Sequence, residues 1–135
     1  MYASCSSTKN TKNEFEGTIS SPNYPSKYRN SKSCTWKLTG PVGEKLKLDS
    51  FTYDIEKEDA CKYDSLRIYD GKSTSYNRIA QLCGNKTYHS LTSSSNTLYI
   101  EFITDRSGVY GGFEIPYSID GTIMFLIYDF FETSL

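Results

Sequence analysis

The sequence predicts an all-β fold in which two antiparallel sheets pack as a β-sandwich. Aromatic residues make up 15% of the 135 residues, and 12 of them are tyrosines, whose flat rings suit the pleated, half-buried surface of a sheet. Short segments of alternating apolar and polar residues recur along the chain, separated by clusters of Gly, Pro, Ser and Asn. No convincing apolar stripe has the 3.6-residue spacing of a helix. Together these observations favour a sandwich of short strands.

The period-2 alternation gives the expected strands in chain order. They lie at residues 34–38, 46–48, 51–55, 63–69, 79–82, 98–103 and 113–117. Asp70-Gly71 is a turn signal that closes the fourth of these strands. Pro22 and Pro25 both lack the N–H that a central strand needs, so residues 22–25 are expected to form an ordered loop.

The strand patterns end near residue 119, which divides the chain into a domain of residues 1–119 and an apolar tail of residues 120–135. Residues 121–131 are almost continuously apolar, and packing on the sandwich as an added edge strand or tail is favoured over the alternative of a partner-binding surface. The segment is far shorter than the roughly 20 apolar residues that span a bilayer. The first residues lack the basic and apolar regions of a signal peptide. We therefore expect that a signal is missing from this sequence or that the chain is a fragment of a longer precursor.

The charge balance excludes two classes of protein. Lys and Arg number 15 and Asp and Glu number 16, which gives a net charge of −1. A value so near zero argues against a nucleic-acid binder and against a protein that reads membranes through a polybasic surface. Any partner must therefore be recognised by a local patch.

The four cysteines, Cys5, Cys34, Cys61 and Cys83, form no C-x-x-C motif and allow three disulfide pairings. With His89 as the single histidine, a Cys/His zinc site is poorly supported, which leaves free thiols or disulfides. Pairing in sequence order would contribute roughly 3–4 kcal/mol per disulfide. Because apolar residues make up only 37% of the chain, such cross-links would compensate for a lean core, and they favour an extracellular setting.

The sequence Asn85-Lys86-Thr87 is an acceptor for N-linked glycosylation, and its place directly after Cys83-Gly84 predicts a surface turn. It supports secretion weakly, because such triplets also occur by chance. We expect glycosylation at Asn85.

Acidic residues gather on both sides of Cys61. Asp54, Glu56, Glu58 and Asp59 precede it and Asp64 follows it. One end of a sandwich would also bring the loop around Asp105 near this segment. Carboxylates that converge repel each other unless they bind a proton or a cation, and Ca²⁺ prefers the oxygen ligands that they offer. The sequence therefore favours calcium over softer metals.

Catalysis is not expected. His89 has Ser90 and further serines nearby, but no nucleophile motif accompanies it, so we expect it on a surface loop. Pairs of carboxylates occur in glycosidases, yet a small sandwich with a lean core offers little room for an enclosed substrate pocket.

Taken together, the cysteines and loops resemble the CUB domain, an extracellular jelly-roll β-sandwich of complement proteases, tolloid-type proteases, endocytic receptors and spermadhesins. The resemblance covers residues 5–117. The matching segments are G-x-I-x-S-P-N-Y-P-x-x-Y at 17–28, C-x-W at 34–36, C-x-Y-D at 61–64, L-C-G at 82–84 and F-x-x-D-x-S at 102–107, followed by Gly112-Phe113 and Tyr117. So many spacings together are highly specific to the family.

The resemblance implies a jelly-roll sandwich with the disulfides Cys5–Cys34 and Cys61–Cys83. It also implies one calcium ion held by Glu56, Asp64 and Asp105, with a backbone oxygen of Ser107. In the family such a site often receives a lysine of a partner, assisted by a nearby tyrosine. Tyr53 and Tyr63 are equal candidates for the assisting tyrosine. Separately, Arg106 and Tyr110 flank the Asp105 loop and are expected to contact a partner.

The expected function is that of a secreted, non-catalytic, calcium-stabilised module that binds a Lys or Arg side chain of an extracellular protein. One such contact is weak, so we expect several domain copies or a homo-oligomer to strengthen it. Two alternatives remain open: a carbohydrate-binding adhesive protein resembling spermadhesins, and the substrate-positioning fragment of a larger secreted protease.

Overall fold

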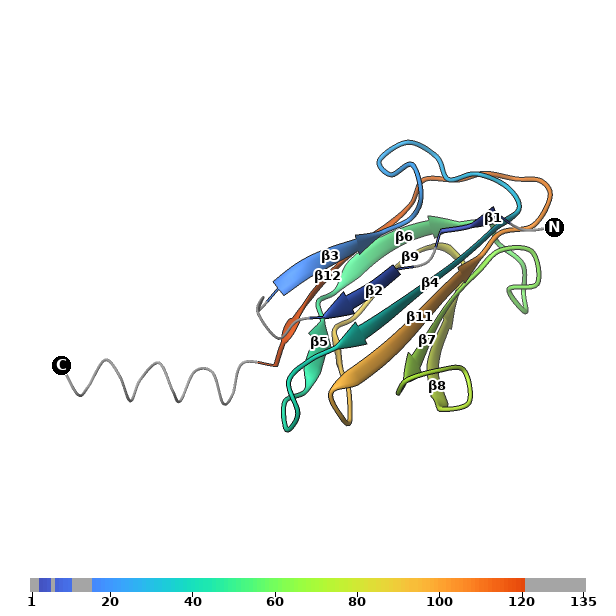
Figure 1. Cartoon of the computed structure of the whole chain (residues 1–135). Coiled ribbons are helices and arrows are strands. Elements are labelled where there is room, and N and C mark those ends of the chain that lie inside the picture. The colour runs from blue at the N-terminus through green and yellow to red at the C-terminus, as the bar shows by residue number, and fades with distance from the viewer. Residues whose placement is uncertain (1–2, 6, 11–15, 121–135) are drawn as a thin grey trace, which may run out of the picture.

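The computed structural model describes residues 3–5, 7–10 and 16–120, and in this part of the chain the regular structure consists of strands (Figure 1). In chain order they are β1 (Ala3–Ser4), β2 (Ser7–Asn10), β3 (Glu16–Ser20), β4 (Lys32–Thr39), β5 (Leu46–Leu48), β6 (Phe51–Ile55), β7 (Ser65–Asp70), β8 (Asn77–Leu82), β9 (Gly84–Tyr88), β10 (Leu91–Thr92), β11 (Thr97–Ile103) and β12 (Gly112–Ile119). Each strand predicted from the sequence is confirmed, although β7 begins at Ser65 rather than at Tyr63.

The strands form two sheets that pack face to face as the predicted sandwich. In the first sheet β4, β11, β7 and β8 are antiparallel neighbours, and β1 and β2 pair in parallel with β4. In the second sheet β12 is central. Its residue Tyr117 pairs with Gly17 of β3 and also with Leu48 of β5, so β3 lies along one side and β5 and β6 follow each other along the other. Strands β9 and β10 then pair with β6 and β5.

One prediction about the second sheet is wrong. The sequence Asn85-Lys86-Thr87 was expected to form a surface turn, but it lies in β9. Only Cys83 separates β8 from β9, and Gly84, whose φ of 91° suits a residue without Cβ, already pairs with Ile55 of β6. The polar side chains of residues 85–87 are tolerated because they are exposed at the edge of the sheet.

Aromatic rings fill the space between the sheets. Trp36 of β4 and Phe102 of β11 both meet Phe113 of the opposite sheet edge-to-face, with ring centroids 6.0 and 5.0 Å apart. Tyr28, from the loop before β4, packs edge-to-face on Phe102 at 5.1 Å. All four rings are buried, as expected for Trp36 in the C-x-W segment. This geometry is the favourable one for aromatic pairs.

Both implied disulfides are present, Cys5–Cys34 and Cys61–Cys83. The first ties the N-terminal segment to β4, and the second ties the loop between β6 and β7 to the end of β8. Residues 22–25 form turns rather than strand, as predicted. His89 is exposed, as expected.

The predicted apolar tail, apart from Asp120, lies outside the described residues, so the division at residue 119 stays a prediction. Within the described ranges, no helix has the length and apolar character that crossing a bilayer would require.

Candidate functional site

Three loops meet at one end of the sandwich: residues 21–31 between β3 and β4, 56–64 between β6 and β7, and 104–111 between β11 and β12. Backbone hydrogen bonds join the first loop to the third. The N–H of Tyr28 donates to the carbonyl oxygen of Tyr110 at 3.1 Å, and the N–H of Ser31 donates to that of Asp105 at 2.7 Å. The first loop is therefore held against the third, which carries the predicted ligands Asp105 and Ser107.

Asp64 lies at the centre of this end and is fully buried. Its Oδ2 accepts a 2.6 Å hydrogen bond from the Tyr28 hydroxyl, and its Oδ1 accepts a 2.8 Å bond from the N–H of Asp105. The Tyr28 oxygen in turn accepts a 3.0 Å bond from the N–H of Glu56. Tyr28 and Asp64 thus connect all three loops. The two bonds that Asp64 accepts are the stronger ones, because their acceptor is a carboxylate.

The carboxylates of Glu56, Asp64 and Asp105 converge as the resemblance implied, with one oxygen of each within 4.8 Å of the others. We refer to these three residues as the acidic cluster. Oε1 of Glu56 is buried and has no hydrogen-bond partner. Asp105 accepts a 3.2 Å bond through Oδ1 from the N–H of Ser107. At Gly108, with φ of 86°, a Cβ would collide with the Glu56 carboxylate, so glycine allows the third loop to approach Glu56.

Burial and mutual repulsion act on the protonation of the acidic cluster. Burial raises the pKa of Glu56, and the charges of Asp64 and Asp105 raise it further. Burial also raises the pKa of Asp64, although the hydrogen bonds from Tyr28 and from the Asp105 backbone oppose that shift. The pKa of the Tyr28 hydroxyl is raised by burial and by its bond to Asp64, so it stays protonated as a donor. The cluster is therefore strained electrostatically when all three groups are ionised.

No basic side chain of the described residues relieves this repulsion. The ion pairs in that part of the chain join Lys47 to Asp49 and Arg67 to Glu101, away from the cluster. A buried carboxylate oxygen without a partner is costly, and a divalent cation would supply the missing partner. The three residues therefore fit the calcium ion that the family resemblance implies, with Glu56, Asp64 and Asp105 as the side chains that would hold it.

The remaining sequence candidates differ in exposure. Tyr63, next to Asp64, is 52% exposed and Tyr110 is 40% exposed, and Arg106 is also exposed. Tyr53 is only 5% exposed because it lies on β6 among core residues. Ser107 is exposed and bonds to Asp105 through its backbone.

Sequence reasoning missed the role of Tyr28. It was noted only as the last residue of the segment at 17–28, yet its hydroxyl connects Asp64 and Glu56. Its place after Pro25 in a loop was the available signal, but a loop tyrosine is usually expected to be exposed rather than buried under acidic residues.

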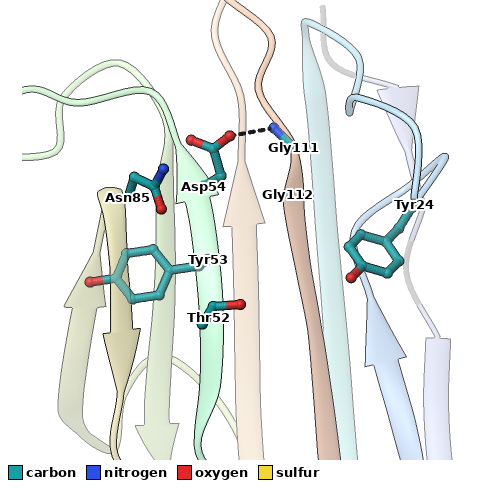
Figure 2. A pocket seen from close by; sticks show the side chains of 7 residues that line it. All are labelled: Tyr24, Thr52, Tyr53, Asp54, Asn85, Gly111 and Gly112. Atoms are coloured by element: carbon teal, nitrogen blue, oxygen red, sulfur yellow. Dashed lines mark hydrogen bonds between the residues drawn. The ribbon is translucent and has the colours of Figure 1, made fainter.

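A shallow hollow of about 190 Å³ lies on the second sheet, lined by residues of β6, β9 and the start of β12 (Figure 2). Asn85 and Tyr53 lie on one side of it, Tyr24 lies on the other, and Asp54 accepts a 3.1 Å bond from the N–H of Gly111 between them. A second hollow of about 640 Å³ runs along β9 and the loop that carries Cys61. Asn85 lines both hollows.

Known proteins resemble this chain over most of its length. It is 35% identical to human Tolloid-like protein 1 over 104 residues. This aligned region covers 77% of this chain and 10% of that protein. It is also 39% identical to Bone morphogenetic protein 1 of Xenopus laevis over 101 residues. This aligned region covers 75% of this chain and 14% of that protein. The chain thus spans a small part of these relatives.

The fold also matches solved structures. A MASP-1 CUB2 domain, whose structure is described as bound to Ca²⁺, superimposes with a TM-score of 0.71 and 29% identity, covering 84% of this chain and 99% of that one. The sequence matches the family model described as CUB domain over residues 5–117. CUB domains are non-catalytic protein-interaction modules that occur in extracellular and secreted proteins. With its fold, disulfides and loop segments all in agreement, this chain belongs to the CUB domain family.

Proposed function

We propose that this chain is a secreted, calcium-stabilised module that binds a basic side chain of a protein partner at its acidic cluster. The observation that carries the proposal is the buried, unpartnered Oε1 of Glu56 among three converging carboxylates. A calcium ion takes 6–8 oxygen ligands, so backbone oxygens such as that of Ser107 and water would complete the shell. The likeness to a CUB domain solved with Ca²⁺ supports this assignment.

The charge balance explains why such a site would attract a cation from a partner. Three carboxylates and one divalent ion leave a formal charge of −1, and part of it lies on oxygens at the surface of the loops. A Lys or Arg side chain would gain Coulomb energy there, while calcium holds the loops in the binding geometry and reduces the entropy lost on association.

Exposure distinguishes between the tyrosines proposed to assist in binding a lysine of the partner. We infer that Tyr63 takes this role, since half of its side chain is open to solvent and it adjoins Asp64. Tyr53 is almost fully buried and lines the two neighbouring hollows. Tyr110 and Arg106 lie in the third loop, exposed, and would form the rim of the contact surface.

Removal of calcium tests the first half of the proposal. We expect calcium to raise the melting temperature of the disulfide-intact protein relative to EDTA, because a ligand bound only by the folded state stabilises it by about 2.7 kcal/mol at a concentration 100 times its Kd. Asp105→Ala should abolish this rise without preventing folding. Asp59→Ala, at an exposed acid of the same loop region that lies outside the cluster, should retain it. An unchanged melting temperature in EDTA would rule out the calcium site.

A titration followed by amide NMR tests the second half. Nα-acetyl-lysine methylamide should shift resonances of residues 56–64 and 104–111 when calcium is present and not in EDTA. Nα-acetyl-norleucine methylamide has a similar aliphatic stem without the charge, and it should leave them unchanged. Equal shifts with both compounds would show that charge is not what the site recognises.

A further inference from the structure

Strand β9 forms an open edge of the second sheet. It pairs with β6 on one side, and no strand of the described residues pairs with its other side. The unpaired N–H and C=O groups of such an edge are a template on which a second chain can add a strand. Proteins that stay monomeric therefore protect such edges.

Strand β8, the corresponding edge of the first sheet, has one form of protection that β9 lacks. Each of the two strands carries one charged residue, Arg78 or Lys86, but the pairing of β8 with β7 is also interrupted by a register shift at Ile68/Tyr69. Bulges and charged side chains both discourage edge pairing. Strand β9 keeps an unbroken register with β6 over five residues, and Lys86 is its single charged residue. It needs another form of cover.

Asn85 is placed to provide that cover. It is exposed on β9, together with Lys86 and Thr87. Because side chains alternate along a strand, Asn85 and Thr87, the two residues that define the acceptor sequence, share one face. Figure 2 shows Asn85 at the side of the hollow, next to Asp54 and Tyr53, and it also lines the larger hollow along β9. Within the described residues no hydrogen bond engages its side-chain amide.

We propose that Asn85 carries an N-linked glycan that covers the free edge of β9 and keeps two copies of this domain from pairing there. The donor is a lipid-pyrophosphate-linked oligosaccharide of the secretory pathway. Nδ2 of Asn85 forms a bond to C1 of the first sugar, the bond from C1 to the pyrophosphate breaks, the lipid pyrophosphate leaves and the amide loses one proton. This inference rests on the proposed secretion but not on calcium.

The test is expression of the chain behind an added signal peptide in mammalian cells, followed by intact mass spectrometry and sedimentation analysis over a wide concentration range. The secreted protein should carry the mass of one glycan and stay monomeric. Asn85→Gln and Thr87→Ala should both lose the glycan and form a concentration-dependent dimer. Thr87→Ser preserves the acceptor sequence and should behave as the original chain.

Each alternative result overturns a stated part of the inference. A secreted, folded protein without a glycan at Asn85 would remove the modification itself. Glycan-free variants that stay monomeric at the highest concentration would remove its role at the edge. Both altered residues are exposed, and circular dichroism with a melting curve checks that the variants fold. Calcium binding is measured separately by the shift of melting temperature, so a failure of the calcium site is distinguishable from either result.

Discussion

The centre of the sandwich and its acidic loop end are stabilised by opposite means. Between the sheets, rings such as Trp36, Phe102 and Phe113 exclude water and carry no charge. At the loop end, Asp64 is as deeply buried as these rings, yet it depends on a hydroxyl and a backbone N–H for its stability there. The stability of the first region should depend on the volume of its side chains, and that of the second on bound ions and pH.

This contrast shows that, in this small domain with a lean apolar fraction, apolar packing and buried acidic groups lie in separate regions. Apolar packing joins the two sheets, and the two disulfides tie the N-terminal segment to β4 and the loop after β6 to the end of β8. The acidic cluster, placed on loops at the margin of that core, is left with unrelieved repulsion and an unpartnered oxygen. A ligand that relieved this repulsion would gain binding energy at the loop end.

The largest effect is expected in the core. Phe102→Ala removes the ring that meets both Tyr28 and Phe113, and a buried Phe→Ala change costs about 3–5 kcal/mol. Denaturant unfolding should show this loss. The difference in unfolding free energy between calcium and EDTA should stay close to that of the original protein, provided the variant remains folded. Loss of the calcium effect in a folded variant would mean that the two regions are not separable.

Tyr28→Phe alters the residue that links the two regions. The ring and its packing on Phe102 remain, but Asp64 loses a donor and the N–H of Glu56 loses its acceptor. Leaving the buried Asp64 oxygen without this donor costs about 1–3 kcal/mol, whereas water can replace the acceptor of the part-buried Glu56 N–H. We expect a smaller loss of stability than for Phe102→Ala, together with weaker calcium binding, measured by calorimetry. Tyr110→Phe, at an exposed tyrosine, serves as the control and should change neither quantity appreciably.

How much the sequence predicts also differs between the regions. Alternation located the strands of the core, because inward residues such as Leu38, Leu48 and Ile100 repeat with the period that a half-buried strand requires. The convergence of Glu56, Asp64 and Asp105 came from the family resemblance, since loops far apart in sequence carry no periodic signal. Local patterns could not show that Tyr28 turns inward or that residues 84–88 form a strand, because tertiary contacts decide both.

A change of pH tests the same site through a smaller and reversible effect. In the calcium-free protein the raised pKa values of Glu56 and Asp64 mean that the folded state holds protons more tightly than the unfolded chain. Ionisation of these two groups therefore costs stability as the pH rises from about 4, the usual carboxyl pKa, through their raised values. Calcium needs the ionised forms. The rise in melting temperature caused by calcium should thus shrink as the pH falls from 7 toward 4.5.

The control for this measurement is Asp105→Ala, in which the difference between calcium and EDTA should be near zero at every pH. A difference that stays constant in the original protein over this range would contradict the assignment of the ionised cluster as the calcium site.

The prediction with the smallest expected effect distinguishes direct coordination of calcium from general electrostatic attraction of the ion. Asp54 lies two residues before Glu56 and outside the acidic cluster, and its carboxylate accepts a bond from the N–H of Gly111. Asp54→Asn keeps an acceptor for that bond and removes one charge, so stability should change by less than about 0.5 kcal/mol. Calcium affinity should fall slightly in dilute buffer, and the difference should fade near 1 M salt, where the Debye length is about 3 Å. Asp105→Ala should lose affinity at any salt concentration. If Asp54→Asn weakens calcium as strongly and as independently of salt, the ion is held by residues other than the three assigned to it.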